Sequence, residues 1–232
     1  MKVAIMQPYA FPYIGYFQLI KAVDVFVFYD DVNFIKKGWI NRNKILVNGA
    51  DYMFTFPIKN ISQNVLINNV ELVAANNYSS ILKTIERNYS KAPYFKKIYQ
   101  LVENILGQNY TYISELAIAS ITQILEYLNI DKKTLISTEH FSETKEMEKE
   151  QRLIQICKQL NADIYINAIG GQELYTKSQF LNSNIKLNFL KPNPIFYKQF
   201  NNQFVPWLSI IDVLMFNSPA EINIMLDQFE LV

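Results

Sequence analysis

The sequence predicts an α/β protein whose mostly parallel sheet is built from both ends of the chain, with a central helical insertion and a β-hairpin. Short buried strands alternate with helical patterns at the start of the chain and again after residue 130. Between them, residues 78–130 show only helical spacing of apolar side chains. Strand–helix alternation favours parallel pairing in one sheet. We therefore expect a single α/β domain over residues 1–232, in which residues 78–130 form a helical subdomain or layer.

The first 30 residues predict two parallel strands joined by a helix. Residues 3–6 are apolar without alternation, which is typical of a strand buried on both faces. Pro8 and Pro12 exclude regular structure from the next stretch and hold it extended. From Ile14 the apolar side chains fall on one helical face, and residues 25–29 form a β-branched and aromatic strand. Such a short connection suits a parallel crossover.

The middle of the sequence predicts a hairpin and then helices. Residues 44–47 and 52–58 flank the segment 48–51, which contains Asn-Gly and is a good hairpin signal. Residues 65–73 are predicted to form a further short strand. From residue 78 to about residue 128 the apolar side chains recur at helical spacing. This block has no glycine-rich or acid–base cluster, so we interpret it as structural.

After residue 130 the α/β alternation returns. The predicted strands are residues 134–137, 163–166 and 185–190. The predicted helices are residues 148–160, 207–216 and 220–229.

The composition narrows the class of partner. Half of the residues are hydrophobic, and the formal net charge is +1. No nucleic-acid partner is indicated, because phosphate binding favours a strongly basic face. The single cysteine, Cys157, excludes an internal disulfide and fits the reducing cytoplasm. No apolar stretch approaches 18 residues and no signal-peptide pattern is present, so we expect a cytoplasmic protein without membrane insertion. A homo-oligomer is compatible with the sequence.

The loop after the first strand is the first candidate binding site. In an open α/β sheet, ligands bind beyond the carboxyl ends of the strands. Gln7, Tyr9, Tyr13 and Gly15 lie there. Gly15 lets backbone approach a ligand, and the following helix offers its N-terminal amides to an anion. The alternative is a proline-stiffened loop packed with aromatic side chains.

Three residues are candidates for acid–base work. Asp30 and Asp31 follow the second strand, where they suit a general base, a bond to sugar hydroxyls or a Mg²⁺ ligand. Nothing in the sequence requires a metal. Turn-forming residues that cap a strand are the alternative, and we expect one of the two to be structural. His140, the single histidine, is the third candidate, with a surface position in a loop as its alternative.

Cationic and aromatic side chains supply candidate ligands for a sugar phosphate. Trp39, Asn41 and Arg42 combine a stacking face, an amide and a planar cation. Arg42 would bind phosphate oxygens while Trp39 covers the apolar face of a sugar. A solvated hairpin edge is the alternative. Lys149 and Arg152 stand three apart in the first turn of a predicted helix, where they could meet an anion.

Two further segments complete the candidate binding residues. Gly170 and Gly171 form a flexible turn after a predicted strand, which is a weak phosphate-loop signal. Ser209 and Asp212 lie where a loop rich in proline and aromatic residues enters a helix. Helix capping alone would explain both of these residues.

These motifs, taken together and in this order, resemble the WbqC family of bacterial proteins. The resemblance covers nearly the whole chain, and its N-terminal motif is specific. The segments that carry it are residues 7–9, 11–17, 22–27, 30–32, 39–45, 149–154, 170–171, 208–214 and 216–217. The sequence departs from the family pattern at residues 166–169, where a small Ser-Gly segment is expected.

The resemblance implies a pathway. Members of that family are associated with the biosynthesis of O-antigen, a part of lipopolysaccharide, and of other surface polysaccharides. It therefore implies work on a sugar, linked to a nucleotide, in the cytoplasm.

Three functions follow from these observations. The first is a transferase that modifies a nucleotide-linked amino sugar by N-acyl or aminoacyl transfer from an unknown donor. Its base would be one of the three acid–base candidates, with phosphates held by Arg42, Lys149 and Arg152, and the sugar or acyl group oriented by Gln7 and Asn41. The second is a nucleotidyltransferase-like enzyme, which is disfavoured because both of the histidine positions in its usual motif would be aromatic here. The third is a non-catalytic sugar-binding or assembly factor.

Overall fold

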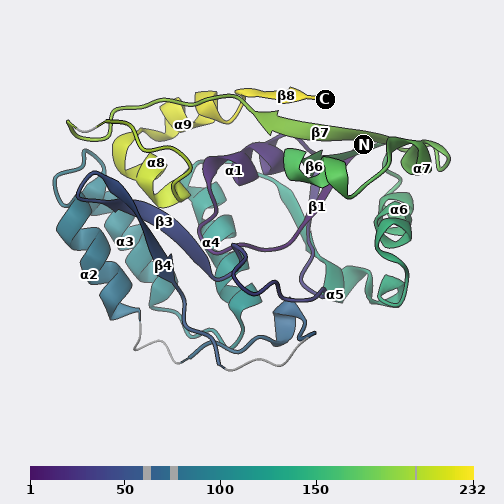
Figure 1. The fold of residues 1–232 in the computed structure, drawn as a ribbon, viewed down its shortest axis with the longest axis horizontal. Coiled ribbons are helices and arrows are strands. Elements are labelled where there is room, and N and C mark those ends of the chain that lie inside the picture. Colours follow the sequence, from purple (N-terminus) through teal and green to yellow (C-terminus); the bar gives the residue numbers. More distant parts are fainter. Residues whose placement is uncertain (60–63, 74–77, 202) are drawn as a thin grey trace.

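The computed structural model describes residues 1–59, 64–73, 78–201 and 203–232. The strands of its main sheet are β1 (Lys2–Met6), β2 (Val25–Phe28), β5 (Lys133–Ile136), β6 (Ile164–Ala168), β7 (Lys186–Pro192) and β8 (Phe229–Leu231). In the described part of the chain these six strands have the order β5-β2-β1-β6-β7-β8 (Figure 1). All neighbours pair in parallel except β7 and β8. The predicted mostly parallel sheet built from both chain ends is confirmed.

The strand order reverses beside β1. From β1 the chain passes through α1 (Ile14–Lys21) to β2 on one side, whereas β6 leads through α7 (Lys177–Leu181) to β7 on the other. Because these strands are parallel, the segments that follow β1, β2, β5 and β6 all leave the same edge of the sheet. Ligand sites of open α/β sheets lie beyond this edge, which is where the candidate site must be sought.

The two faces of the sheet pack against different helices. Ala4, Phe26 and Phe28 belong to a hydrophobic cluster that also contains residues of the central helices, whereas Val3 and Val27 belong to a second cluster. Alternate residues of a strand point to opposite faces, which explains this division. The second cluster is completed by α6 (Lys149–Gln159) and α7.

The central helices and the hairpin are confirmed. Residues 78–130 contain α2 (Ser79–Tyr89), α3 (Phe95–Leu106) and α4 (Ile113–Tyr127). The hairpin consists of β3 (Arg42–Val47) and β4 (Ala50–Thr55), and its turn residues Asn48 and Gly49 both have positive φ, 52° and 79°. Positive φ at both positions is what a two-residue hairpin turn of type I′ requires. The division into one domain with a helical layer stays a prediction.

Four segments differ from the prediction. Strand β4 covers Ala50–Thr55, whereas residues 52–58 were predicted. Residues 65–73 form no strand: a 3-10 helix, η1 (Ile67–Asn69), lies there between single β-bridges. The helix predicted over 207–216 is α8 (Ile210–Phe216), and it starts late because Ser209 caps it. The helix predicted over 220–229 is α9 (Pro219–Met225), after which Phe229 begins strand β8.

Short helices that the sequence pattern did not predict fill the connections. They are α5 (Ser137–His140), η3 (Ser142–Thr144), η4 (Ile169–Glu173) and α7. The Gly170-Gly171 segment thus lies in a 3-10 helix, not in an open turn. No helix of the described residues is long and apolar enough to cross a lipid bilayer.

Candidate active site

Asp30 and Asp31 lie at the carboxyl edge of the sheet, beside the residues that follow β5. The register pairs Phe28 of β2 with Ile136 of β5, so Ser137 and Thr138 come next to the two aspartates. Asp30 Oδ1 accepts hydrogen bonds from the backbone N–H of Thr138 (3.1 Å) and from its hydroxyl (2.6 Å). The Ser137 hydroxyl lies 3.0 Å from Asp30 Oδ1 and 2.5 Å from Asp31 Oδ1. Both carboxylates are buried.

Asp31 forms an ion pair inside the protein. Its Oδ2 accepts a hydrogen bond from the guanidinium of Arg152, and both side chains are only 3% exposed. Arg152 Nε donates to the Thr144 hydroxyl (3.0 Å), and its guanidinium carbon lies 4.7 Å from the centre of the Tyr29 ring. Burial raises the pKa of Tyr29 to about 12, so this phenol stays neutral. The predicted anion-binding cation Arg152 is therefore already compensated by a carboxylate.

Asp30 has no such partner among the described residues. No ion pair joins it to a lysine, arginine or histidine among the described residues. Its Oδ1 takes the hydrogen bonds from Ser137 and Thr138, whereas Oδ2 accepts none from a described residue. Of the two buried carboxylates only Asp31 is paired with the guanidinium, and Asp30 is the one with an oxygen left for a ligand.

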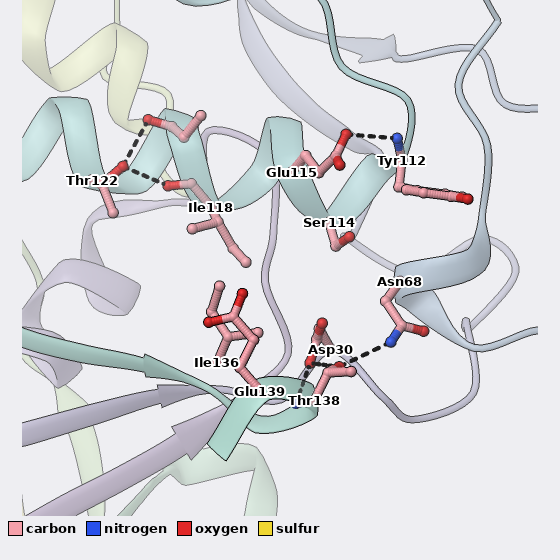
Figure 2. A pocket seen from close by; sticks show the side chains of 11 residues that line it. Asp30, Asn68, Tyr112, Ser114, Glu115, Ile118, Thr122, Ile136, Thr138 and Glu139 are labelled. Carbon is pink, nitrogen blue, oxygen red and sulfur yellow. Dashed lines mark hydrogen bonds between the residues drawn. The ribbon is translucent and has the colours of Figure 1, made fainter. Parts of the chain in front are cut away.

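A cavity of about 440 Å³ adjoins Asp30. Figure 2 shows Asp30, Thr138 and Glu139 on one side of it, with Ser114, Glu115 and Thr122 of α4 across from them. Its lining residues are Asp30, Asn68, Tyr112, Ser114, Glu115, Ile118, Ala119, Thr122, Ile136, Thr138 and Glu139. Three of these side chains are carboxylates, and none is a lysine or an arginine. The cavity is therefore acidic.

Asn68 holds Thr138 and the backbone of Asp30 in place. Its Nδ2 donates to the Thr138 hydroxyl (2.9 Å), and its backbone N–H donates to the Asp30 carbonyl (3.0 Å). Its Oδ1 is closed to solvent, has no hydrogen-bond partner among the described residues, and points away from Asp30 in Figure 2. A ligand in the cavity does not reach this oxygen, so Asn68 acts on the site through the two hydrogen bonds that it donates.

Most of this cavity lies outside the sequence-predicted site. Asp30 alone among the predicted residues lines it, and the α4 residues come from the block that we interpreted as purely structural. Thr138 and Glu139 carried a usable signal, because they directly follow a predicted strand as Asp30 does. Asn68 and Ser114 carried none, since only the tertiary structure brings them to the sheet edge.

The residues after β1 lie elsewhere on the same edge. The Tyr16 hydroxyl donates to the Gln7 carbonyl (2.9 Å), and the Tyr9 and Tyr16 rings are 5.6 Å apart. Burial, with a smaller effect of Tyr13, raises the pKa of Tyr9 to about 12. A Cβ at Gly15 would lie 2.3 Å from the Tyr13 ring, so Gly15 is needed for this ring to cover the start of α1. None of these residues lines the cavity beside Asp30.

The predicted sugar-phosphate residues of the hairpin make internal contacts. Arg42 Nε donates to the Gly38 carbonyl (2.8 Å), a second guanidinium nitrogen donates to the Lys37 carbonyl, and the guanidinium lies 5.8 Å from the centre of the Trp39 ring. Asn41 is buried and donates to the Phe56 carbonyl (2.9 Å). These bonds hold the start of β3, and the phosphate-binding role of Arg42 stays a prediction.

His140 and Lys149 are surface residues. His140 is exposed, with a ring nitrogen 3.1 Å from the Ile136 carbonyl, and it does not line the cavity. Lys149 is exposed at the first position of α6, whereas Arg152, one turn later, points inwards to Asp31. The structure therefore does not bring the two cations together.

The two glycines after β6 differ in their surroundings. A Cβ at Gly171 would lie 3.0 Å from the Asn167 side chain, so this glycine allows close packing. A Cβ at Gly170 would meet nothing within 4 Å. Close packing against Asn167 explains the glycine at position 171 but not the one at position 170. The phosphate-binding role of both glycines stays a prediction.

Ser209 and Asp212 hold loops in place. Ser209 Oγ accepts from the Ile211 N–H (3.3 Å), which is the predicted cap, and donates to the carbonyl of Phe11 (2.7 Å) in the loop after β1. Phe11 is wholly buried and has φ 47°. Asp212 is also buried and accepts hydrogen bonds from Tyr89, Tyr197 and Gln199. Burial raises the pKa of its carboxyl.

The described residues contain no group of three or more histidine, cysteine, aspartate or glutamate side chains placed to hold a metal ion.

Comparison with known proteins identifies the family. The model of the WbqC-like protein family matches residues 7–224. The chain is also 30% identical over 228 residues to the uncharacterized protein Rv1507c of Mycobacterium tuberculosis, and the alignment covers 95% of each chain. No solved structure matches. The chain belongs to the WbqC-like protein family.

Proposed function

We propose that this WbqC-like protein is a transferase that acylates the amino group of a nucleotide-linked amino sugar, with the sugar bound in the cavity beside Asp30. The observation that carries the proposal is the charge of this cavity: Asp30, Glu115 and Glu139 line it, and no cationic side chain of the described part of the chain does. An amino group, protonated at neutral pH, and the hydroxyls of a sugar suit such a lining, whereas a phosphate is repelled by it.

The polar atoms of the cavity support a sugar as the rest of the ligand. The Thr138 hydroxyl donates to Asp30 and the Thr122 hydroxyl to the Ile118 carbonyl, so both can accept a hydrogen bond from a sugar hydroxyl, and Ser114 lines the cavity with a third hydroxyl. The volume of about 440 Å³ lies in the usual range of small-molecule sites. The nucleotide of the substrate would lie outside the cavity, because its phosphates need cations that the lining does not supply. Arg42 and Lys149 are the candidates for that contact.

Asp30 would act as the general base. In Figure 2 one oxygen of Asp30 points towards α4 across the cavity, while Oδ1 is held by Ser137 and Thr138. Oδ2 takes one proton from the bound ammonium and releases it to water. The amine then attacks the carbonyl carbon of an activated acyl or aminoacyl donor, and a carbon–nitrogen bond forms. The bond from the carbonyl carbon to the leaving group breaks, and the departing group takes the second proton of the nitrogen.

In this proposal the two adjacent carboxylates have different roles. Asp31 is neutralised by Arg152 and fixes the edge of the sheet, while Asp30 faces the ligand. The association of the family with O-antigen and other surface polysaccharides supports a cytoplasmic step in the synthesis of those sugars. The donor stays open between an acyl thioester and an aminoacyl ester.

Mass spectrometry of reaction mixtures tests this proposal. Purified protein is incubated with nucleotide-linked amino sugars and acyl or aminoacyl donors, and the gain of one acyl group is measured. Asp30→Asn should lower turnover by about 10²–10⁴-fold, the usual contribution of a general base. Asp131→Asn is the matched control, because Asp131 is exposed and precedes β5 at the opposite end of the strand. Circular dichroism checks that both variants are folded.

Two outcomes would overturn the proposal. One is turnover by Asp30→Asn equal to that of the wild-type protein. The other is an absence of acyl transfer for every pair while the amino sugar still binds beside Asp30, which would make the protein a sugar-binding or assembly factor.

A further inference from the structure

A second cavity lies at the carboxyl end of β7. It has a volume of about 430 Å³ and is lined by the segments around Pro194 and Pro206, by the start of α1 and by α8. Its lining residues are Tyr13, Ile14, Pro192, Asn193, Pro194, Ile195, Phe196, Tyr197, Gln203, Phe204, Pro206, Trp207, Leu208 and Val213. It shares no residue with the cavity beside Asp30. We call it the aromatic groove.

Two large aromatic side chains of the groove are open to solvent. Phe196 is 74% exposed and Trp207 is 68% exposed. The Trp207 ring lies 6.1 Å from that of Tyr13, and the Phe196 ring 5.3 Å from that of Phe204. Exposed aromatic faces that gather around one hollow are a favourable surface for a flat ring to stack on.

A buried polar network holds this surface in shape. Asp212 accepts hydrogen bonds from the Tyr197 hydroxyl (2.5 Å) and from Gln199 Nε2 (2.7 Å). Gln199 in turn accepts from the Val205 N–H (2.7 Å) and donates to the Val205 carbonyl (3.1 Å). The two halves of the connection that carry Phe196 and Trp207 are therefore joined through the Gln199 amide, which Asp212 holds in place. A wall fixed in this way is preorganised for a ligand.

Trp207 adopts an unfavourable backbone conformation. Its φ is 61°, in the left-handed region that bulky residues rarely occupy. Its indole gains little burial in return, because most of it faces solvent. Strain at a residue that presents an exposed aromatic face is typical of a ligand site, where the surroundings fix the residue.

The described residues of the groove carry no formal charge. None of those that line it is an aspartate, glutamate, lysine, arginine or histidine, and their polar groups are the amides of Asn193 and Gln203 and the hydroxyls of Tyr13 and Tyr197. A phosphate or an ammonium finds no counter-charge there. A sugar ring would leave many of its hydroxyls without partners, and an acyl chain would leave the two amides without partners. A heteroaromatic ring has apolar faces and a polar edge, and it suits both parts of the lining.

We infer that the aromatic groove binds a flat, uncharged heteroaromatic ring with a hydrogen-bonding edge, the chemistry of a nucleobase. The ring stacks on Trp207 and Phe196, and its edge meets Asn193 and Gln203. This inference does not depend on acyl transfer beside Asp30, because the two cavities have separate linings.

Tryptophan fluorescence tests the inference directly. The chain has two tryptophans, so Trp39→Phe leaves Trp207 as the single reporter. This protein is titrated with adenosine, guanosine, cytidine, uridine and thymidine, all without phosphate. At least one nucleoside should quench the emission of Trp207 with saturation. Adding Phe196→Ala, at an exposed position, should weaken this binding roughly tenfold, the loss expected for one stacking face. Tyr52→Ala, an exposed aromatic on the hairpin, is the matched control and should change nothing.

Several results would overturn the inference. Linear quenching without saturation by all five nucleosides would show that the groove has no site for the ring. Quenching that depends on protein concentration alone would show that a second copy covers the groove, and saturation by a proline-rich peptide in place of the nucleosides would show a peptide groove. Calorimetry with glucosamine on the Phe196→Ala protein separates this inference from the proposed function, since sugar binding beside Asp30 should be unchanged.

Discussion

Adjacent carboxylates take different roles here because their neighbours differ. The position of Asp30 and Asp31 after a buried strand was enough to predict a site at the sheet edge. The sequence could not tell which of them is structural, because the partner of Asp31 is Arg152, which lies 121 positions away. Ser137 and Thr138, whose hydroxyls hold Asp30, lie 107 and 108 positions from it. The choice between the two aspartates is therefore made by tertiary contacts.

The buried ion pair predicts a large effect of removing one partner. Arg152→Met leaves Asp31 charged and unpaired in the protein interior, so the free energy of unfolding should fall by about 3–5 kcal/mol. The double variant Asp31→Asn/Arg152→Met should recover part of this loss, because no charge is left unpaired. Urea denaturation measures both variants.

A surface pair provides the control for this prediction. Lys191 and Glu230 lie 4.0 Å apart, and both are more than half exposed. Lys191→Met should cost less than about 1 kcal/mol. Equal costs for Arg152→Met and Lys191→Met would contradict the structural role given to Asp31.

At the scale of elements, local signals predicted well and long-range pairings did not. The hairpin was predicted because Asn48-Gly49 alone specifies its turn. Residues 65–73 carry the apolar pattern of a strand, but single bridges to Asn33 and Tyr112 hold them instead. Strand β8 was missed because it has three residues and pairs with β7 across a long connection. A strand of three residues is too short to show an alternating pattern of apolar and polar side chains in the sequence.

Asp212, in the first turn of α8, should make the stability of the protein depend on pH. Burial raises the pKa of Asp212 above its value in the unfolded chain. The stability that this carboxyl contributes is therefore fully present below the unfolded pKa, about 4, and is lost as pH rises through the folded pKa. Asp212→Asn cannot ionise. The free energy of unfolding of the wild-type protein, minus that of Asp212→Asn, should fall over this interval and then level off.

Glu221 in α9 provides a control of opposite sign. Hydrogen bonds from the hydroxyl and the backbone N–H of Ser218 lower its pKa, so its contribution is lost as pH falls through the folded pKa. The difference between wild type and Glu221→Gln should therefore rise with pH. Urea unfolding over a pH series measures both differences. If the free energy of unfolding of the wild type minus that of Asp212→Asn stayed flat or rose with pH, the role given to the buried Asp212 carboxyl would be contradicted.

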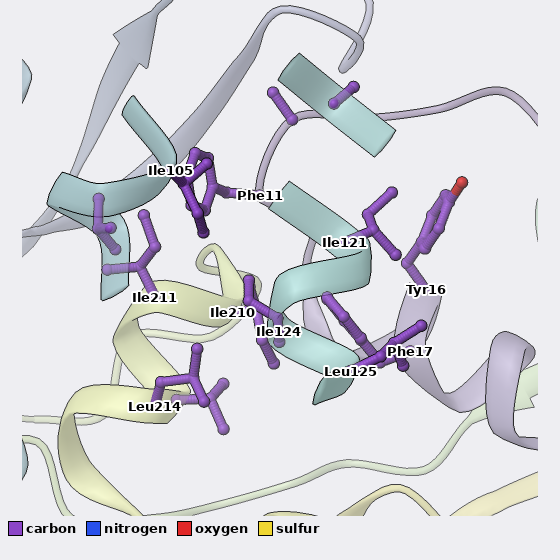
Figure 3. Close-up of a cluster of buried hydrophobic side chains, with 14 of the residues drawn as sticks. Phe11, Tyr16, Phe17, Ile105, Ile121, Ile124, Leu125, Ile210, Ile211 and Leu214 are labelled. Atoms are coloured by element: carbon purple, nitrogen blue, oxygen red, sulfur yellow. The ribbon is translucent and has the colours of Figure 1, made fainter. Parts of the chain in front are cut away.

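At the scale of the whole molecule, one hydrophobic cluster joins the helices to the sheet. Figure 3 shows Phe11 and Phe17 gathered with Ile105 of α3, Ile121 of α4 and Ile210 of α8. The same cluster contains Ala4, Phe26 and Phe28 of the sheet. The helical character of residues 78–130 could be read from spacing alone, but their packing against the sheet could not. For the same reason, the part of α4 that lines the cavity was not predicted.

This shared core predicts a single unfolding transition. Because the helices and the sheet bury apolar surface against each other, neither should unfold alone. Urea unfolding followed by far-ultraviolet circular dichroism and by tryptophan fluorescence should give coincident curves. Two separated transitions would instead identify residues 78–130 as an independent subdomain.

The central claim is that the acidic cavity beside Asp30 binds the amino group of a sugar. Isothermal titration calorimetry with glucosamine and with N-acetylglucosamine tests it most directly, because the two ligands differ in whether the amine is free to carry a charge. The account predicts that the wild-type protein and Asp131→Asn bind glucosamine more tightly by roughly tenfold or more, a difference of about 1.4 kcal/mol. It also predicts that Asp30→Asn removes this preference. Equal affinity of the wild-type protein for both sugars, or a preference that survives in Asp30→Asn, would contradict it.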